Sequence, residues 1–334
     1  MTRTLYAGSY TGCGFEHFYQ EWLPRGEGAR VCLLKGAPGT GKGAMLQTLA
    51  AAWERQGRQV TVFASAREPG LPEAVISGRD AVACAALLRE EELPFARVVD
   101  LDACLDGPAL RAVLPEAETL SRRIARLRRR ASRCLQGAAA ALADTAAVYA
   151  GAADPGAVCN LRMELLQWMG GTPGPARRMF PQAVTPAGVV SGEAPLARAN
   201  TLCLDLPWGL DADALLYPVA VALNARGTGY EAGMQMLDGQ KIACLCTDSH
   251  AILSHVETGR ETRTLRLDEG VLRREREALA FNRAACDLWM GQAVEALAAA
   301  RDCRAQLARL TADALRPDTR EDARAEVFSF FMDL

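Results

Sequence analysis

The residues whose types and spacing best suit a chemical role form one short run: Gly36, Ala37, Pro38, Gly39, Thr40, Gly41 and Lys42. An apolar run at 31–34 precedes them and an amphipathic segment at 45–53 follows, which predicts a buried strand, a turn and a helix. Glycines let successive backbone N–H groups converge on a phosphate, and a helix N-terminus adds partial positive charge. Lys42 would bring an ammonium to the outer phosphates. The run therefore predicts a phosphate-binding loop.

The position after the lysine departs from the usual pattern. It normally carries a Ser or Thr hydroxyl that holds Mg²⁺, whereas this chain has Gly43 and then Ala44. The nearest hydroxyls, on Thr40 and Thr48, do not sit at the expected place. We therefore predict that residues 36–44 bind ATP or GTP. Mg²⁺ is a possible cofactor, but its usual hydroxyl ligand is missing.

Phosphoryl transfer also needs a carboxylate beside the outer phosphates, usually at the carboxyl end of a strand. In the first half of the chain the candidate is Asp100, which follows the apolar pair at 98–99. A turn or helix-capping role explains Asp100 equally well. In the second half the candidate is Asp248, close after the apolar stretch at 242–246. Both are weak candidates for a metal ligand.

The composition excludes several classes of function. The 334 residues include 38 Lys and Arg and 40 Asp and Glu, so the net charge of −2 supplies no field that attracts nucleic acid or a membrane. Eleven cysteines, mostly within apolar runs, indicate buried thiols in a reducing compartment. The N-terminus lacks an apolar signal core, and no uncharged run reaches about 18 residues. We expect a cytoplasmic protein without membrane contact.

The order of the predicted elements indicates an α/β fold. Strands are predicted at 60–64, 81–86 and 98–99, and this spacing favours parallel sheets with crossover helices. Residues 108–169 then show a helical period, and a Gly- and Pro-rich linker follows at 170–175.

The helical segment carries a run of arginines that fits either a solvated helix face or an electropositive arm for a polyanionic partner. No aromatic residues interleave with them, so the run does not favour a nucleic-acid partner. The arginines are Arg122, Arg123, Arg126, Arg128, Arg129, Arg130 and Arg133.

After the linker the pattern of the first half returns in altered form. The distance between equivalent points falls along the chain, from 174 at Thr11 and Thr185, to 169 at Pro38 and Pro207, to 161 at Gly78 and Gly239. This alignment matches 78–84 with 239–245 and places Asp248 at the carboxyl end of the third strand. Asp211 and Asp213 stand near the position of Lys42 and would repel phosphate. We therefore expect no nucleotide at the second loop.

The resulting fold class is α/β, with tandem P-loop-like parallel sheets flanked by helices, each half followed by a helical arm. The predicted domains are a nucleotide-binding domain at 1–107, a helical arm at 108–170, a degenerate second domain at 171–265, and a second arm with the C-terminal tail at 266–334. The apolar tail at 327–332 is expected to dock on a core. Cys244, Cys246, His250 and His255 lack the spacing of a familiar zinc site and are interpreted as packing residues.

In this order of elements the chain resembles a family of bacterial tandem P-loop proteins described as ATPases or nucleotide kinase-like proteins. The resemblance covers nearly the whole chain and implies a nucleotide-binding fold whose substrate is not established. In that family both loops read GxPGTGKS and both third strands end in Asp followed by His. This chain departs from the family at Gly43, throughout the second loop and at Leu87, which puts hydrolysis in doubt. The matching features are Tyr6-Ala7, Thr11, Gly14-Phe15, Leu34 to Lys42, Met179-Phe180, Thr185-Pro186 and Gly188-Val189.

Three functions are compatible with the sequence. The favoured one is a nucleoside triphosphate-binding protein with weak or absent hydrolysis, because the usual metal ligands are lost. The second is an active ATPase or a small-molecule or nucleotide kinase, in which Asp100 or a second-half carboxylate completes the site. The loop string resembles that of adenylate kinases, but no second nucleotide site or arginine-bearing lid follows. The third is an interaction scaffold whose arginine-rich arm binds a protein partner or a second copy.

Overall fold

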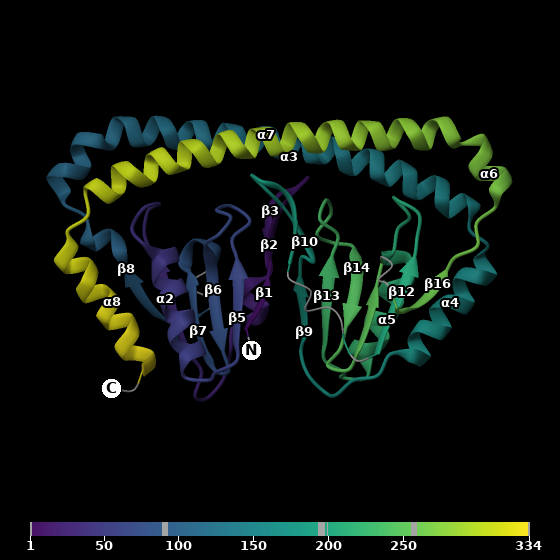
Figure 1. The fold of residues 1–334 in the computed structure, drawn as a ribbon, viewed down its shortest axis with the longest axis horizontal. Coiled ribbons are helices and arrows are strands. Elements are labelled where there is room, and N and C mark those ends of the chain that lie inside the picture. The colour runs from purple at the N-terminus through teal and green to yellow at the C-terminus, as the bar shows by residue number, and fades with distance from the viewer. Residues whose placement is uncertain (1, 89–92, 193–197, 199, 255–258, 333–334) are drawn as a thin grey trace.

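The loop-bearing strand lies inside a sheet because its residues are apolar on both faces, as a buried parallel strand requires. The computed structural model describes residues 2–88, 93–192, 198, 200–254 and 259–332. Within these residues the chain forms two six-stranded sheets, which lie side by side beneath a pair of long helices (Figure 1). We call the part with the first sheet the first half, and the part with the second sheet the second half.

The first sheet has the strand order β1-β5-β6-β7-β4-β8. Every strand but β6 runs in the same direction, since β6 pairs antiparallel with both of its neighbours. The loop-bearing strand β4 is central and has parallel partners on both sides. The strands are β1 (Thr2–Leu5), β4 (Arg30–Lys35), β5 (Val60–Ala64), β6 (Pro72–Ser77), β7 (Asp80–Cys84) and β8 (Arg97–Asp100).

The second sheet repeats this strand order, with β9-β13-β14-β15-β12-β16. Its antiparallel strand is β14, and the pairing of β13 with β14 has a register shift that matches the shift between β5 and β6. From β4 to β6 the equivalent residues are a constant 170 positions apart. The strands are β9 (Ala176–Met179), β12 (Asn200–Asp205), β13 (Tyr230–Met234), β14 (Ile242–Cys246), β15 (His250–Leu253) and β16 (Glu261–Thr264).

The predicted α/β class is confirmed, but each sheet is mixed and not purely parallel. The antiparallel strand at 72–77 was not predicted, and without it the third strands of the two halves were aligned wrongly. Residues 242–246 form β14, the counterpart of β6, whereas the counterpart of β7 is β15. The spacing of 161 between Gly78 and Gly239 therefore joins positions that are not equivalent.

Two long helices cross from one half of the molecule to the other (Figure 1). Helix α3 (Gly107–Ala152) follows the first sheet and leads to α4 (Pro155–Trp168), which packs on α5 (Asp213–Ala225) of the second half. Helix α7 (Arg276–Asp313) begins after the second sheet and the short α6 (Glu269–Arg274), and runs antiparallel to α3. It leads to α8 (Pro317–Met332), which packs on the first half.

Apolar packing joins the last helix to the first half. Phe331 of α8 is 2% exposed, and its ring lies 5.5 Å from that of Trp53, centroid to centroid, in an edge-on arrangement. Trp53 belongs to α2 (Lys42–Arg55), the helix that follows the loop. The expected docking of the tail at 327–332 is thus confirmed for the described part of that segment.

The two halves meet through two small hairpins and a short helix near the centre. Tyr6 and Phe180, which are 174 residues apart, form an antiparallel bridge in which the N–H of Phe180 donates to the carbonyl of Tyr6 at 2.7 Å. Self-pairing of equivalent positions is what an approximate two-fold relation produces. The remaining elements are β2 (Gly8–Thr11), β3 (Gly14–His17), α1 (Tyr19–Trp22), β10 (Gln182–Thr185) and β11 (Gly188–Ser191).

Candidate phosphate-binding loop

The predicted loop connects the end of β4 at Lys35 to the start of α2 at Lys42. Gly36, Gly39 and Gly41 have φ angles of 147°, 93° and 95°, a region that L side chains avoid. A Cβ on Gly36 would also lie 2.8 Å from the hydroxyl of Thr40, which is fully buried beneath the loop. The glycine spacing of the motif therefore follows from backbone geometry.

Backbone donors gather at this loop. Among the described residues, the N–H groups of Gly39, Gly41, Lys42 and Gly43 find no acceptor. They lie at the N-terminus of a 14-residue helix, which adds partial positive charge. An anion with several acceptor oxygens, such as a phosphate, fits this arrangement.

The Lys42 ammonium forms hydrogen bonds with the loop itself. It donates to the carbonyl oxygens of Gly36 and Ala37 at 2.5 and 2.7 Å, and lies 3.2 Å from the hydroxyl of Thr40. Burial lowers the pKa of Lys42, and the nearby Arg304 guanidinium lowers it further. These carbonyls are neutral acceptors, so an arriving phosphate would offer the ammonium a stronger, charge-assisted partner.

Helix α7 covers the loop directly. A Cβ built on Gly39 would lie 2.1 Å from the carbonyl oxygen of Ala308, so the two backbones are in contact. On α8, Arg320 reaches the neighbouring glycine, Gly41, with its Cδ 4.0 Å from the position of a Cβ there. The loop of the first half is thus closed by helices that follow the second half in sequence.

This contact predicts the effect of Gly39→Ala. The methyl group must displace the α7 backbone, and the positive φ costs about a further 1–2 kcal/mol. We expect a loss of unfolding free energy that clearly exceeds that of Gly57→Ala, whose φ is also positive at 75° but which has nothing within 4 Å. Denaturant titration of both variants measures the difference. Equal losses would contradict the close contact of loop and helix.

The missing Mg²⁺ ligand has a packing explanation. A Cβ on Gly43 would lie 3.1–3.2 Å from three carbon atoms of the Leu71 side chain. A Ser or Thr side chain at position 43 would therefore have to displace Leu71. In the described part of the chain, no group of three or more His, Cys, Asp or Glu residues is arranged to hold a metal ion.

Asp100 lies at the expected edge of the sheet, but its carboxylate is used in a local turn. Asp100 ends β8 opposite Lys35 of β4, and its Oδ1 accepts the N–H of Asp102 at 2.9 Å, capping a short 3₁₀ turn. The carboxylate that contacts the loop is Asp102, whose Oδ1 accepts the N–H of Ala37 at 2.7 Å. Asp102 was missed, although a second carboxylate two residues after a strand end is a signal that could have indicated it.

Asp248 lies at the opposite edge of its sheet, so its predicted position was wrong. It follows β14, which is antiparallel, and His250, two residues further on, pairs with Asn200, the first residue of β12. The carboxylate accepts a hydrogen bond from Thr172 at 2.7 Å. Cys244 and Cys246 are buried, as expected for packing residues, and His255 lies outside the described residues.

The second loop keeps a glycine turn but has lost its cation. Gly209 is 170 residues after Gly39 and also has a positive φ, and a Cβ there would lie 2.4 Å from Thr145 of α3. Ala212 takes the place of Lys42 at this spacing. Asp211 forms an ion pair with Lys241 at 2.7 Å. The long helix that covers each loop therefore follows the other half in sequence.

Six of the seven arginines between 122 and 133 are exposed, which fits a solvated helix face. Arg128 differs, because it is half-buried and lies beside Tyr10 of β2. No helix in the described part of the chain has both the length and the apolar character needed to span a bilayer.

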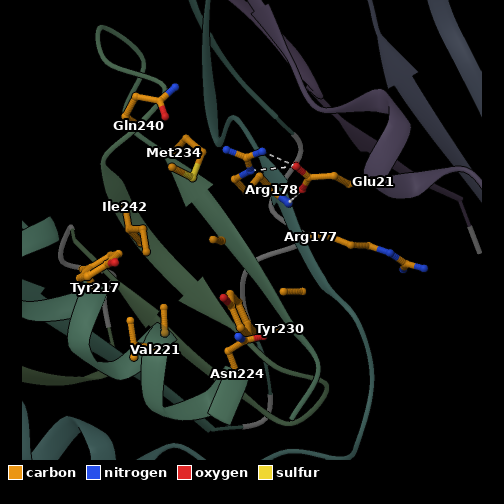
Figure 2. A pocket seen from close by; sticks show the side chains of 13 residues that line it. Glu21, Arg177, Arg178, Tyr217, Val221, Asn224, Tyr230, Met234, Gln240 and Ile242 are labelled. Atoms are coloured by element: carbon orange, nitrogen blue, oxygen red, sulfur yellow. Dashed lines mark hydrogen bonds and ion pairs between the residues drawn. The ribbon is translucent and has the colours of Figure 1, made fainter. Parts of the chain in front are cut away.

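A cavity of about 440 Å³ lies beside α5 in the second half (Figure 2). Tyr217 and Val221 on the helix face Met234 and Ile242 on the strands. At its rim the Arg178 Nε donates to Glu21 at 2.8 Å, and Arg177 also lines the cavity. A cavity of about 390 Å³ occupies the corresponding flank of α2 in the first half. Both cavities lie along helix flanks, whereas the unpaired N–H groups and the lysine lie at the loop. We therefore take the loop as the candidate site.

Comparison with known proteins agrees with this choice. Residues 25–86 match the model of a protein family described as an AAA domain. The matched segment contains β4, the loop, α2 and the strands up to β7. This similarity supports a P-loop type of nucleotide-binding unit in the first half. No curated protein and no solved structure matches the sequence.

Proposed function

We propose that the protein binds a nucleoside triphosphate, ATP or GTP, at residues 36–44 of the first half and hydrolyses it slowly or not at all. The observation that carries the proposal is the convergence of unpaired N–H groups and the Lys42 ammonium at the start of α2. The similarity of residues 25–86 to an AAA domain supports it. The second half lacks the lysine, so we assign it a supporting role.

The proposed weakness of hydrolysis rests on the surroundings of the loop. Stabilising the charge that develops on a transferred phosphoryl group needs a metal or several cations. Leu71 packs against Gly43, the position that usually carries the hydroxyl, and one oxygen of Asp100 caps a turn. An active ATPase or kinase would need a carboxylate brought in from elsewhere.

We further propose that the two halves are degenerate tandem copies, since strand order and register shift coincide. We also propose the division at 107, 170 and 265, which is supported by the last strands of the two sheets ending at Asp100 and Thr264 and by α4 ending at Trp168. A cytoplasmic location fits the free cysteines, most of which are buried. The interaction of this protein with a protein partner or a second copy stays a prediction.

Calorimetric titration of the full chain with ATP, in EDTA and then in Mg²⁺, tests the proposal. We expect binding in both conditions with affinities within about threefold. The double variant Gly43→Ser with Leu71→Ala supplies a hydroxyl and the space for it, so its affinity should rise on addition of Mg²⁺. If the wild type binds ATP only with Mg²⁺, the expectation of metal-independent binding is wrong. If it does not bind ATP in either condition, the proposed nucleotide-binding function is overturned.

A further inference from the structure

A charged pair links the arm helix α7 to the turn beside the loop. Arg304 of α7 forms an ion pair with Glu68, with 2.7 Å between Nε and Oε1, and its Nη2 donates to Oε2 at 3.0 Å. Glu68 lies between β5 and β6, at the edge of the sheet where β4 ends. Arg304 is one helical turn before Ala308, the residue that covers Gly39, so both face the loop.

Three charged side chains, those of Lys42, Arg304 and Glu68, surround the place where the phosphates are expected. The pKa of Lys42 responds to the charges of both Arg304 and Glu68, which places all three groups within electrostatic reach of one another. Burial is the largest single influence and raises the pKa of Glu68, but the hydrogen bond and charge of Arg304, together with the charges of Arg67 and Lys42, outweigh it and lower the pKa. Glu68 is therefore ionised and holds Arg304 in the absence of another anion.

The neighbouring carboxylate, that of Glu73, is held more firmly than that of Glu68. Glu73 is 4% exposed and accepts hydrogen bonds from Tyr19 at 2.6 Å, Ser65 at 2.7 Å and Arg67 at 2.7 Å. Among the described residues, Arg304 is the one hydrogen-bonding partner of the Glu68 carboxylate, whose side chain is 32% exposed. Its donors fix Glu73 in place, whereas Arg304 can exchange Glu68 for another anion.

The helix that covers the second loop carries no arginine at the position equivalent to Arg304. Thr145 of α3 covers Gly209 as Ala308 covers Gly39, and the residue one turn before Thr145 is Ala141. Ala212 likewise replaces Lys42. Arg304 on the covering helix thus accompanies Lys42 in the loop, whereas alanine stands at both equivalent positions of the second half. The second loop does have an arginine beside it, Arg283, but this residue belongs to α7 and lies over the Trp208 ring at 5.1 Å.

We propose that Arg304 is a second phosphate-binding cation of the site, supplied by the arm helix, and that the outermost phosphate of the nucleotide replaces Glu68 as its partner. This inference rests on the proposed nucleotide site. A guanidinium matches two phosphate oxygens with two parallel N–H donors, and a phosphate carries more charge than a carboxylate. The exchange makes the site prefer a triphosphate to a diphosphate.

Titration with ATP and with ADP, both without metal, measures this preference in the full chain. Arg304→Ala should weaken ATP binding by about tenfold or more while changing ADP binding little, in line with one lost charge-assisted hydrogen bond. Glu68→Gln removes the competing carboxylate and should raise the ratio of ATP to ADP affinity severalfold. Arg309→Ala, an exposed arginine on the same helix, is the matched control and should match the wild type.

The outcomes separate this inference from the proposed function. If Arg304→Ala and Glu68→Gln leave the ratio of ATP to ADP affinity unchanged while Lys42→Ala removes binding, Arg304 is a structural residue and the inference fails, although the nucleotide site stands. If the wild type binds neither nucleotide, both proposals fail. Should Arg304→Ala not fold, as judged by circular dichroism, Glu68→Gln still decides, because it keeps the size of the side chain.

Discussion

Replacing Lys42 by alanine is expected to weaken ATP binding by about a hundredfold or more. The ammonium can give at least two charge-assisted hydrogen bonds to the phosphates, and each such bond contributes about 1.5–3 kcal/mol. Its present acceptors, the carbonyls of Gly36 and Ala37, belong to the loop itself, so a small movement of the side chain would bring the ammonium to phosphates bound there. Calorimetric titration of the variant with ATP measures the loss.

The second half offers a matched control for this variant. Lys241 lies beside the degenerate loop and pairs with Asp211, so Lys241→Ala removes a lysine of the same kind without touching the first loop. We expect ATP binding by Lys241→Ala to equal that of the wild type. Equal affinities for Lys42→Ala and the wild type would show that the nucleotide, if bound, sits elsewhere.

Phe331→Ala should lower the free energy of unfolding of the first half by about 3–5 kcal/mol, the usual cost of emptying a buried phenylalanine site. The ring packs against Trp53 and lies 5.8 Å below the guanidinium of Arg30, so its removal leaves a cavity between α8 and the first half. Since Trp53 belongs to α2, we also expect faster hydrogen exchange in that helix. Denaturant unfolding and hydrogen exchange measure the two effects.

Phe281→Ala provides the comparison, because Phe281 is 71% exposed on α7. A surface substitution of this kind changes stability by about 0.5 kcal/mol or less. If both variants lose the same small amount, α8 is not an integral part of the first half, and the packing described between Phe331 and Trp53 does not persist in solution.

The sequence predicted the features that depend on neighbouring residues. The run from 31 to 53 indicated strand, loop and helix, and the structure has β4, the loop and α2 there. The helical arms predicted at 108–170 and 266–334 agree with α3, α4, α7 and α8, which account for most of both segments. Local hydrophobic period and glycine positions carry this information directly.

Features that depend on pairing between distant segments were not predicted. Strand β6 begins at a proline and carries Glu73 on an otherwise apolar strand, so its period was obscured and the edge of the sheet at which Asp248 lies was misassigned. The contact of Arg304 with Glu68 joins residues 236 positions apart. No local pattern distinguishes Arg304 from the other arginines of α7, because only the crossing of the helices brings it to the loop.

The crossed helices also bear on how the protein is made. During synthesis the first half emerges early, but the helix that completes its core, residues 317–332, emerges after the whole second half. Until then Trp53 and its neighbours lack their final apolar cover, a condition that favours aggregation or chaperone binding of a nascent chain. Closing contacts over such sequence separations is slow. We therefore expect the two halves to reach their native state together, late, and not one after the other on the ribosome.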